Sequence, residues 1–478
     1  MIRVLVTHPY LLDHDPHERE LGKPYTPITT LIAAAIVREA GIACEFFDAM
    51  FCRELAEFES VVDQVRPTHI AVLADDLSVS IKMCLSTVRA DTQAMAQIGA
   101  KRGIPVLVGG PDVSDHPALF VDGNLISAAV GDATEILVPW LLGESGIAGL
   151  HGTGGLGGRR TTMQSLDHLP EPARDLIDVQ AYADTWRRSH GFWELNVSTS
   201  RGCPFRCNWC AKPTWGRTLA VRRADLVADE VRRAMSMWGP DRIWFTDDIF
   251  ALQPSWLQEY REALQGDRFP YRALCRVDLL EQPSYADDLA ATGCEEVWVG
   301  AESGSDRVLA AMDKGVTVEQ ITRAVQAAHQ RGIRVGLFLQ LGYPGETLVD
   351  VSRTIAMVER LSPDEIGVSV SYPLPGTLFY EHVAESLGET HWKGSMENRP
   401  LFGATYTDGF YGVAKEVLRS THSSGRLGIV GRRFLRDPGP RTARRLLGGI
   451  GHSVRLPWMK RKLMRAANPN PEAVVLTW

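Results

Sequence analysis

The chain has 478 residues, of which 45% are hydrophobic and 23% are charged, and its formal net charge at pH 7 is −7. This length predicts about three structural units, and the composition excludes a disulfide-stapled miniprotein, a fibrous protein and a largely disordered chain. No apolar run approaches the roughly 18 residues of a membrane-spanning helix. The first residues pass directly into a strand-like run without the pattern of a signal peptide, so we expect a cytoplasmic protein.

The first part of the chain alternates short apolar runs with helical patterns. Helices are expected around residues 30–40 and 81–100, each followed by glycine. The strand-like runs are residues 2–7, 44–47, 69–74, 105–108 and 126–130. This alternation predicts an α/β fold with a doubly wound parallel sheet over residues 1–143, which binds ligands at the carboxyl ends of its strands.

A glycine-rich stretch and a second alternation follow. Residues 144–190 are expected to be a linker, because the glycine-rich sequence at 144–171 lacks apolar periodicity. Six further strand-like runs, with helical segments between them, are residues 195–199, 242–246, 272–275, 296–300, 334–341 and 365–372. They predict a partial (β/α)6 barrel over residues 191–385, with chemistry at the carboxyl ends of its strands.

Three of the eight cysteines lie within eight residues, just after the first strand of this barrel. The segment reads Cys203-Pro-Phe-Arg-Cys207-Asn-Trp-Cys210. In a reducing compartment, such a cluster indicates metal or redox chemistry rather than disulfides. One loop with this spacing supplies three thiolates to an iron–sulfur cubane, whereas the alternative, a closed zinc site, would need a fourth Cys or His.

The CxxxCxxC spacing, with Trp209 before the last cysteine, resembles the hallmark of the radical S-adenosylmethionine (SAM) superfamily. The resemblance implies that Cys203, Cys207 and Cys210 hold a [4Fe–4S] cluster whose open iron binds SAM. Reductive cleavage of SAM would then give a 5′-deoxyadenosyl radical. The segments Phe245–Asp248, Gly300–Gly304 and Gly342–Glu346 resemble the SAM-contacting strand ends of this superfamily. The SAM contacts implied in this way are Trp209, Asp247, Asp248, Arg276, Glu302, Ser303 and Gln340.

The carboxylates of Asp247 and Asp248 have two alternative functions besides SAM binding, since adjacent acids also bind metals or cap helices. Tyr343 and Tyr372 are candidates for the residue that donates hydrogen to the substrate radical, only because they follow strand ends.

Most of the chain resembles the cobalamin-binding branch of that superfamily. The resemblance rests on the Gly109-Gly-Pro111 turn, the Gly131-Asp-Ala-Thr-Glu135 turn and Pro373-Leu-Pro-Gly-Thr377. It implies cobalamin contacts at Pro9, Tyr10, Asp76, Leu77, Ser78, Gly109, Gly110, Pro111, Gly131 and Glu135. The DxHxxG motif that supplies a lower histidine ligand is absent, because His14 and His17 lack its spacing and glycine. Cobalamin is therefore expected either to bind without such a ligand or not to bind at all.

The resemblance implies radical methylation of an unactivated carbon, with cobalamin carrying the methyl group. The same branch contains cyclases and rearrangement enzymes, including the anaerobic magnesium-protoporphyrin ester cyclase type. A methylthiotransferase would use Cys44, Cys52 and Cys84 for a second cluster, although their spacing does not fit. A cobalamin or redox sensor without turnover is the non-enzymatic alternative.

The C-terminal region, residues 386–478, is expected to be helical and basic. Between Lys415 and Arg465 it holds 14 Lys and Arg against two acids. This region could contact an anionic membrane surface, cover the barrel mouth or bind an anionic substrate or carrier. Nucleic acid is not expected, because the region has few aromatic residues for stacking on bases. The other expected partners are a small-molecule substrate, either carrier-bound or hydrophobic, and an electron donor such as flavodoxin or ferredoxin.

Overall fold

The fold is that of a computed structural model. It describes residues 2–75, 85–152, 155–156, 158, 165–210, 218–374, 377–387, 399–428, 431, 435 and 440–469. The predicted cobalamin contacts Asp76, Leu77 and Ser78 lie outside the described residues. So do parts of the linker, of the segment at 373–377 and of the C-terminal region.

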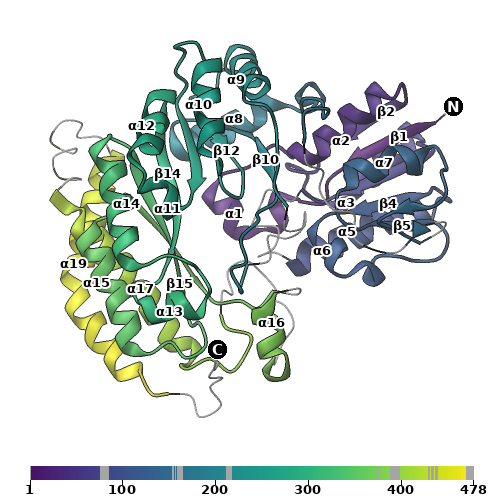
Figure 1. Ribbon diagram of the computed structural model, residues 1–478. Coiled ribbons are helices and arrows are strands. Elements are labelled where there is room, and N and C mark those ends of the chain that lie inside the picture. Colours follow the sequence, from purple (N-terminus) through teal and green to yellow (C-terminus); the bar gives the residue numbers. More distant parts are fainter. Residues whose placement is uncertain are drawn as a thin grey trace.

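A parallel sheet forms the N-terminal unit (Figure 1), as the sequence predicts. Its strand order is β2-β1-β3-β4-β5-β7, with the first five parallel and β7 antiparallel to β5. The strands are β1 (Arg3–Thr7), β2 (Ala43–Phe47), β3 (His69–Leu73), β4 (Val106–Gly109), β5 (Ile126–Ala129) and β7 (Leu150–His151). The strand order reverses between β1 and β3, which is the switch point where ligands of such sheets bind.

Helices cover both faces of this sheet. α2 (Ile28–Glu39) and α7 (Ala133–Leu141) pack Ala33, Val37 and Leu137 against one face. α3 (Leu55–Val65) and α5 (Leu85–Ala100) pack Phe58 and Met95 against the other. Two short helices, α1 (Pro16–Leu21) and α6 (Pro111–Asp115), stand at the carboxyl edge of the sheet.

The segment predicted to be a linker folds in part. It contains the short strands β6 (Ile147–Ala148) and β8 (Gly155–Leu156) and the helix α8 (Val179–His190). Asp178 caps α8 by accepting hydrogen bonds from two backbone amides, and the helix ends at Gly191, which has φ +83°. Its buried Tyr182 and Trp186 belong to the barrel core, so residues 174–190 are an integral part of the fold.

A second parallel sheet forms the open partial barrel that the sequence predicts. Its six strands follow the linear order β16-β15-β14-β13-β12-β9. They are β9 (Glu194–Val197), β12 (Arg242–Phe245), β13 (Tyr271–Cys275), β14 (Cys294–Glu302), β15 (Arg334–Leu341) and β16 (Glu365–Val370). The longer helices between them are α9 (Ala224–Trp238), α10 (Pro254–Ala263), α12 (Pro283–Thr292), α14 (Val318–Gln330) and α15 (Leu348–Leu361). The expected fold class is therefore confirmed.

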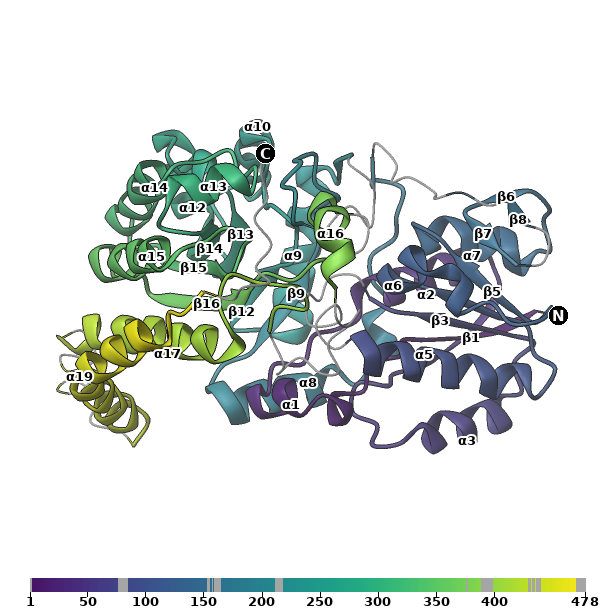
Figure 2. The same cartoon turned by 90° about the horizontal axis from the view of Figure 1, so that it is seen from below.

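The C-terminal region is helical, as predicted. α17 (Asp408–Gly425) contacts α15 and β16, and α19 (Pro440–Ala466) packs on the outside of α17. Figure 2 shows these two helices at the end of the molecule farthest from the N-terminal sheet. No helix within the described residues combines the length and the hydropathy needed to cross a membrane.

Candidate active site

The cysteine loop begins beyond the carboxyl end of β9. After β9, the chain forms β10 (Ser200–Arg201), which pairs antiparallel with β11 (Ala220–Val221). Gly202 then turns the chain with φ +87°, a left-handed conformation that glycine adopts without strain. Cys203, Cys207 and Cys210 follow, and all three are half-buried.

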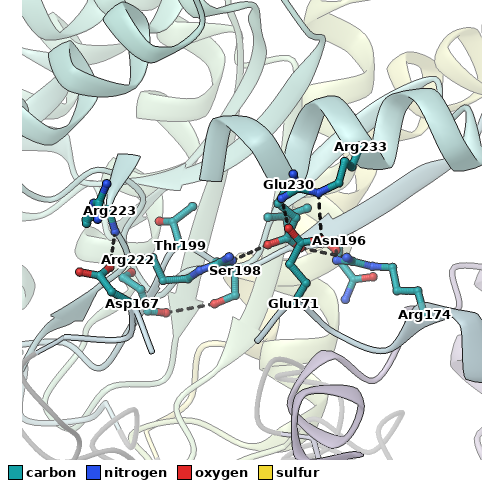
Figure 3. A network of polar contacts seen from close by, with 12 residues as sticks. Asp167, Glu171, Arg174, Asn196, Ser198, Thr199, Arg222, Arg223, Glu230 and Arg233 are labelled. Atoms are coloured by element: carbon teal, nitrogen blue, oxygen red, sulfur yellow. Dashed lines mark hydrogen bonds and ion pairs between the residues drawn. The ribbon is translucent and has the colours of Figure 1, made fainter. Parts of the chain in front are cut away.

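A buried charge network fixes the strand that enters this loop (Figure 3). Glu230 of α9 accepts hydrogen bonds from Arg174, at 2.9 Å, and from Arg222. The same arginines donate to backbone oxygens of Asn196 and Ser198, at 2.9 and 3.1 Å. Burial alone would raise the pKa of Glu230, but the two arginines lower it, so the carboxylate stays charged.

Asn208 attaches the middle of the loop to the opposite side of the barrel. Its Nδ2 donates to the Ala311 oxygen at 2.7 Å, and its Oδ1 accepts from the Tyr343 hydroxyl at 2.9 Å. The backbone N–H of Phe379 donates to the Asn208 oxygen at 3.0 Å. The buried Tyr343, a predicted catalytic candidate, is thereby placed as a support of the cysteine loop.

The three cysteines line one cavity of about 310 Å³ at the carboxyl ends of the barrel strands. Its polar lining comes from successive strand ends and includes Asp248, Arg276, Glu302, Gln340 and Ser369. Its aromatic lining consists of Phe205, Trp209, Trp298 and Phe338. Within the described ranges, no three His, Cys, Asp or Glu side chains gather tightly enough for a single metal ion, and the thiols share the wall of this larger space.

Lys314 brings a positive charge into the cavity. Its Nζ donates to Glu302 Oε1 at 2.8 Å and lies 5.6 Å from the centre of the Trp209 ring. Burial alone would lower the pKa of the Lys314 ammonium, but Glu302 and the thiolates of Cys207 and Cys210 raise it. Lys314 therefore stays charged beside the three cysteines.

The two aspartates after β12 have different surroundings. Asp248 lines the cavity. Asp247 is buried, and its Oδ1 accepts hydrogen bonds from Thr199 N and Thr199 Oγ1, each at 2.9 Å, and from Ser200 Oγ at 2.6 Å. Burial raises the pKa of Asp247 to about 6 despite these bonds. Asp247 thus joins the end of β12 to the start of the cysteine loop.

The other predicted SAM contacts also divide into cavity-lining and supporting residues. Gln340 lines the cavity, and its buried Oε1 has no hydrogen-bond partner among the described residues, so it is available to a bound molecule. Arg276 lies over the Phe205 ring at 3.5 Å and binds Asp278 at 2.8 Å. Ser303 is buried, and its Oγ accepts from Ser305 N at 3.2 Å, which shapes the turn after β14.

The described residues of the predicted cobalamin site lie at the carboxyl edge of the N-terminal sheet. Pro9 and Tyr10 follow β1, the Gly109-Gly110-Pro111 turn joins β4 to α6, and Gly131 and Glu135 follow β5. Gly110 has φ +131°, and a Cβ there would lie 2.8 Å from the Ala74 oxygen. Only glycine therefore lets the β3 and β4 ends approach each other so closely.

A buried ion pair connects this edge with the cysteine loop. Arg201, two residues before Cys203, donates to Asp132 Oδ2 at 2.8 Å and to Thr134 Oγ1 at 3.3 Å. Asp132 follows Gly131 and is fully buried. This pair joins the turn after β5 to the strand that leads into the cysteine loop.

Three further residues near the predicted sites are engaged within the fold. His14 Nδ1 lies 2.8 Å from Asp91, and Asp112, after the Gly-Gly-Pro turn, forms a two-point ion pair with Arg89. Tyr372 is buried beyond the end of β16 and outside the cavity lining.

Sequence reasoning missed several residues of the site. Lys314 and Trp298 belong to no recognisable motif. The fold places Lys314, in the loop after α13 (Asp306–Ala311), next to Glu302. Asp132 lies inside the recognised turn after β5, but its partner Arg201 belongs to the other unit, and nothing local in the sequence connects them.

The chain was compared with known proteins. Residues 197–358 match the model of the radical SAM superfamily. The chain is 29% identical over 58% of its length to an uncharacterized methyltransferase of Pyrococcus horikoshii, covering 62% of that protein. It is 23% identical over 48% of its length to the bacteriochlorophyllide d C-12(1)-methyltransferase of Chlorobaculum tepidum, covering 52% of that protein. The chain thus spans about half to two thirds of the length of these relatives.

Two solved structures share the fold. The radical SAM methyltransferase TsrM from Kitasatospora setae matches with a TM-score of 0.65 and 20% identity, over 80% of this chain and 76% of that one. The cobalamin-dependent radical SAM enzyme OxsB matches with a TM-score of 0.73 and 15% identity, over 96% of this chain and 72% of that one.

Proposed function

Since residues 197–358 form a radical SAM domain, we propose that the chain is a cobalamin-dependent radical SAM enzyme that methylates an unactivated carbon. The observation that carries this proposal is the shared cavity of the three cysteines, which the Arg201–Asp132 pair connects to the carboxyl edge of a second parallel sheet. The methyltransferases among the similar proteins support the same chemistry.

When bound, a [4Fe–4S] cluster and SAM supply a 5′-deoxyadenosyl radical that abstracts hydrogen, and cobalamin supplies the methyl group. Cys203, Cys207 and Cys210 hold the cluster through three thiolates. Three protein ligands suit a centre that keeps one iron open to SAM.

The cavity residues orient SAM in this proposal. Asp248 and Glu302 offer carboxylates to its ammonium group, Lys314 and Arg276 offer cations to its carboxylate, and the buried Gln340 oxygen accepts a hydrogen bond. The aromatic walls exclude water, which protects a radical from quenching. Asp247 and Ser303 hold the strand ends in place, and Tyr343 supports the cysteine loop.

Cobalamin is proposed to lie at the carboxyl edge of the N-terminal sheet. The residues proposed to contact it are Pro9, Tyr10, Asp76, Leu77, Ser78, Gly109, Gly110, Pro111, Gly131 and Glu135. No lower histidine ligand is proposed, because the imidazole of His14 binds Asp91. The proposed boundaries are 1–143 for this unit, 144–190 for the connection, 191–385 for the barrel and 386–478 for the C-terminal region.

The proposed partners follow from this chemistry. The substrate is a small molecule, and the cluster receives its electron from a flavodoxin or a ferredoxin. A cytoplasmic location suits thiolate ligands that must stay reduced. Peripheral membrane contact is proposed for the basic C-terminal region.

Anaerobic reconstitution with iron, sulfide, SAM, hydroxocobalamin and a low-potential reductant tests the function without a known substrate. We expect 5′-deoxyadenosine, and methylcobalamin formed at the expense of SAM. No 5′-deoxyadenosine above the level of the Cys203→Ala variant would overturn the enzymatic proposal and favour a sensor. If cobalamin binds but is never methylated, a cyclase or rearrangement enzyme is favoured, and product mass then distinguishes these from a methyltransferase by one CH2 unit.

A further inference from the structure

The helix α19 carries an unusual combination of surface residues. It forms the outermost layer on α17, away from the N-terminal sheet (Figures 1 and 2). Its residues Met459 and Leu463 are buried in the core shared with α17. Gly449 lies against Leu427, where a Cβ would come within 2.7 Å of that side chain. One side of α19 is therefore fixed against the protein.

The opposite side of α19 exposes an apolar stripe. Leu447, Ile450, Val454 and Trp458 follow each other at intervals of three and four residues, which places them in one line along a helix. Leu447 is 69% exposed, Val454 76% and Trp458 62%. Large apolar side chains that line up in solvent indicate a binding surface rather than random surface composition.

Positive charges border this stripe. The exposed cations on α19 include Arg444, Arg455, Arg461, Lys462 and Arg465, and the helix contains no Asp or Glu. Lys462 Nζ lies 5.5 Å from the centre of the Trp458 ring. Lys460 instead points back to Glu359 of α15, at 3.7 Å. The solvent side of α19 is therefore apolar along its centre and cationic along its border and C-terminal end.

We propose that the stripe Leu447–Ile450–Val454–Trp458 inserts into the interface of an anionic lipid bilayer, with α19 lying parallel to the membrane. Apolar and tryptophan side chains enter the boundary between headgroups and acyl chains, while Arg and Lys reach the lipid phosphates. A second copy of the chain would bring two cationic surfaces together. Nucleic acid would use the cations but leave the apolar stripe in water.

Vesicle co-sedimentation of the full-length, cluster-loaded protein tests this surface. We expect binding to vesicles of phosphatidylcholine with phosphatidylglycerol, at least tenfold weaker binding to pure phosphatidylcholine, and loss of binding as the salt concentration rises. Val454→Ser with Trp458→Ser, and separately Arg461→Gln with Lys462→Gln, should each weaken binding at least tenfold. These side chains are solvent-exposed, so thermal unfolding should not change.

Matched control variants distinguish the effect of the stripe from nonspecific adsorption by exposed apolar side chains and from the effect of net charge. Leu142→Ser with Met237→Ser removes two exposed apolar side chains elsewhere, and Lys101→Gln with Arg268→Gln removes two exposed cations. Both should bind vesicles like the unmodified protein. Equal binding by all four variants, or no binding by the unmodified protein, would overturn the proposal. So would a dimer in solution that Trp458→Ser dissociates, or cosedimentation that a short RNA duplex abolishes while the Val454 and Trp458 substitutions leave it intact.

This proposal is independent of the proposed chemistry. SAM cleavage by the α19 variants in detergent-free buffer should equal that of the unmodified protein, because α19 contributes nothing to the cavity. If the unmodified protein cleaves SAM but does not bind vesicles, only the proposed membrane surface is rejected, and the proposed chemistry is not.

Discussion

At the scale of single residues, some side chains line the cavity and others hold the lining side chains in place. Glu302 shows both roles. It lines the cavity, has a left-handed backbone with φ +57°, and binds Lys314 at 2.8 Å. Gly300 permits this arrangement, since a Cβ there would lie 2.4 Å from Glu302 Oε1 and 2.5 Å from Lys314 Nζ. The strained backbone at Glu302 thus belongs to the same residue that forms the buried ion pair with Lys314 beside the cysteines.

Replacing Lys314 by Met should destabilise the protein, because it leaves the buried Glu302 carboxylate without its cation. We expect a loss of about 3 kcal/mol in the free energy of unfolding, measured by urea denaturation. Lys314→Arg keeps the charge and should recover more than half of this loss. Met and Arg variants of equal stability would contradict an electrostatic role for Lys314.

Asp247 predicts a specific dependence of stability on pH. Its pKa is raised from 3.8 to about 6 by burial, so folding favours its protonated form. The stabilising contribution is therefore full below pH 3.8 and lost as the pH rises to about 6. Asp247→Asn keeps the acceptor oxygen but cannot ionise. From pH 4 to pH 7 the unmodified protein should lose about 2–3 kcal/mol relative to this variant, as followed by chemical denaturation. A constant difference would contradict the raised pKa.

At the scale of elements, the alternation of strands and helices was predictable from sequence, since apolar periodicity reports which faces are buried. The run predicted at 334–341 is β15, and the one predicted at 242–246 is β12 with one residue fewer. The helix α8 was not predicted, because its buried Tyr182 and Trp186 follow a glycine-rich stretch and pack into the core that the barrel forms.

The cysteine cluster was also predictable from sequence. Its three cysteines lie close together in the chain, so their spacing can be seen without the fold. The Lys314–Glu302 and Arg201–Asp132 pairs join residues that only the fold brings together, and no local pattern encodes them.

The Arg201–Asp132 pair should be a strong connection between the two units. Asp132→Asn leaves a buried guanidinium without its anion, and we expect a loss of about 3 kcal/mol in stability. As a control, Asp175→Asn breaks the exposed pair between Asp175 and Arg38. That loss should be below about 1 kcal/mol. Equal effects of the two substitutions on urea denaturation would contradict the importance of burial.

At the scale of the whole molecule, two separate sheets carry the two proposed cofactor sites. The N-terminal sheet packs its helices in two clusters of its own, while the barrel, α8 and the C-terminal helices share a third, which also includes Tyr10, Leu31 and Val88 of the N-terminal unit. The described links between the units run through side chains such as Arg201, Asn196 and Tyr182 rather than through a common sheet. Each site should therefore survive damage to the other.

Paired substitutions test this independence. Replacing Cys203, Cys207 and Cys210 together by Ala should remove the cluster iron while cobalamin still binds stoichiometrically, because the carboxyl edge of the N-terminal sheet contributes no thiol to the cavity. Gly110→Ala forces a Cβ to within 2.8 Å of the Ala74 oxygen and should weaken cobalamin binding at least tenfold, with full iron content. Gly412→Ala, in α17, meets no atom within 4 Å and should change neither. Iron analysis and the corrin absorption spectrum of each purified protein measure both cofactors at once. If the cysteine variant lost cobalamin as well as iron, the two sites would form a single cooperative unit, joined through the Arg201–Asp132 pair.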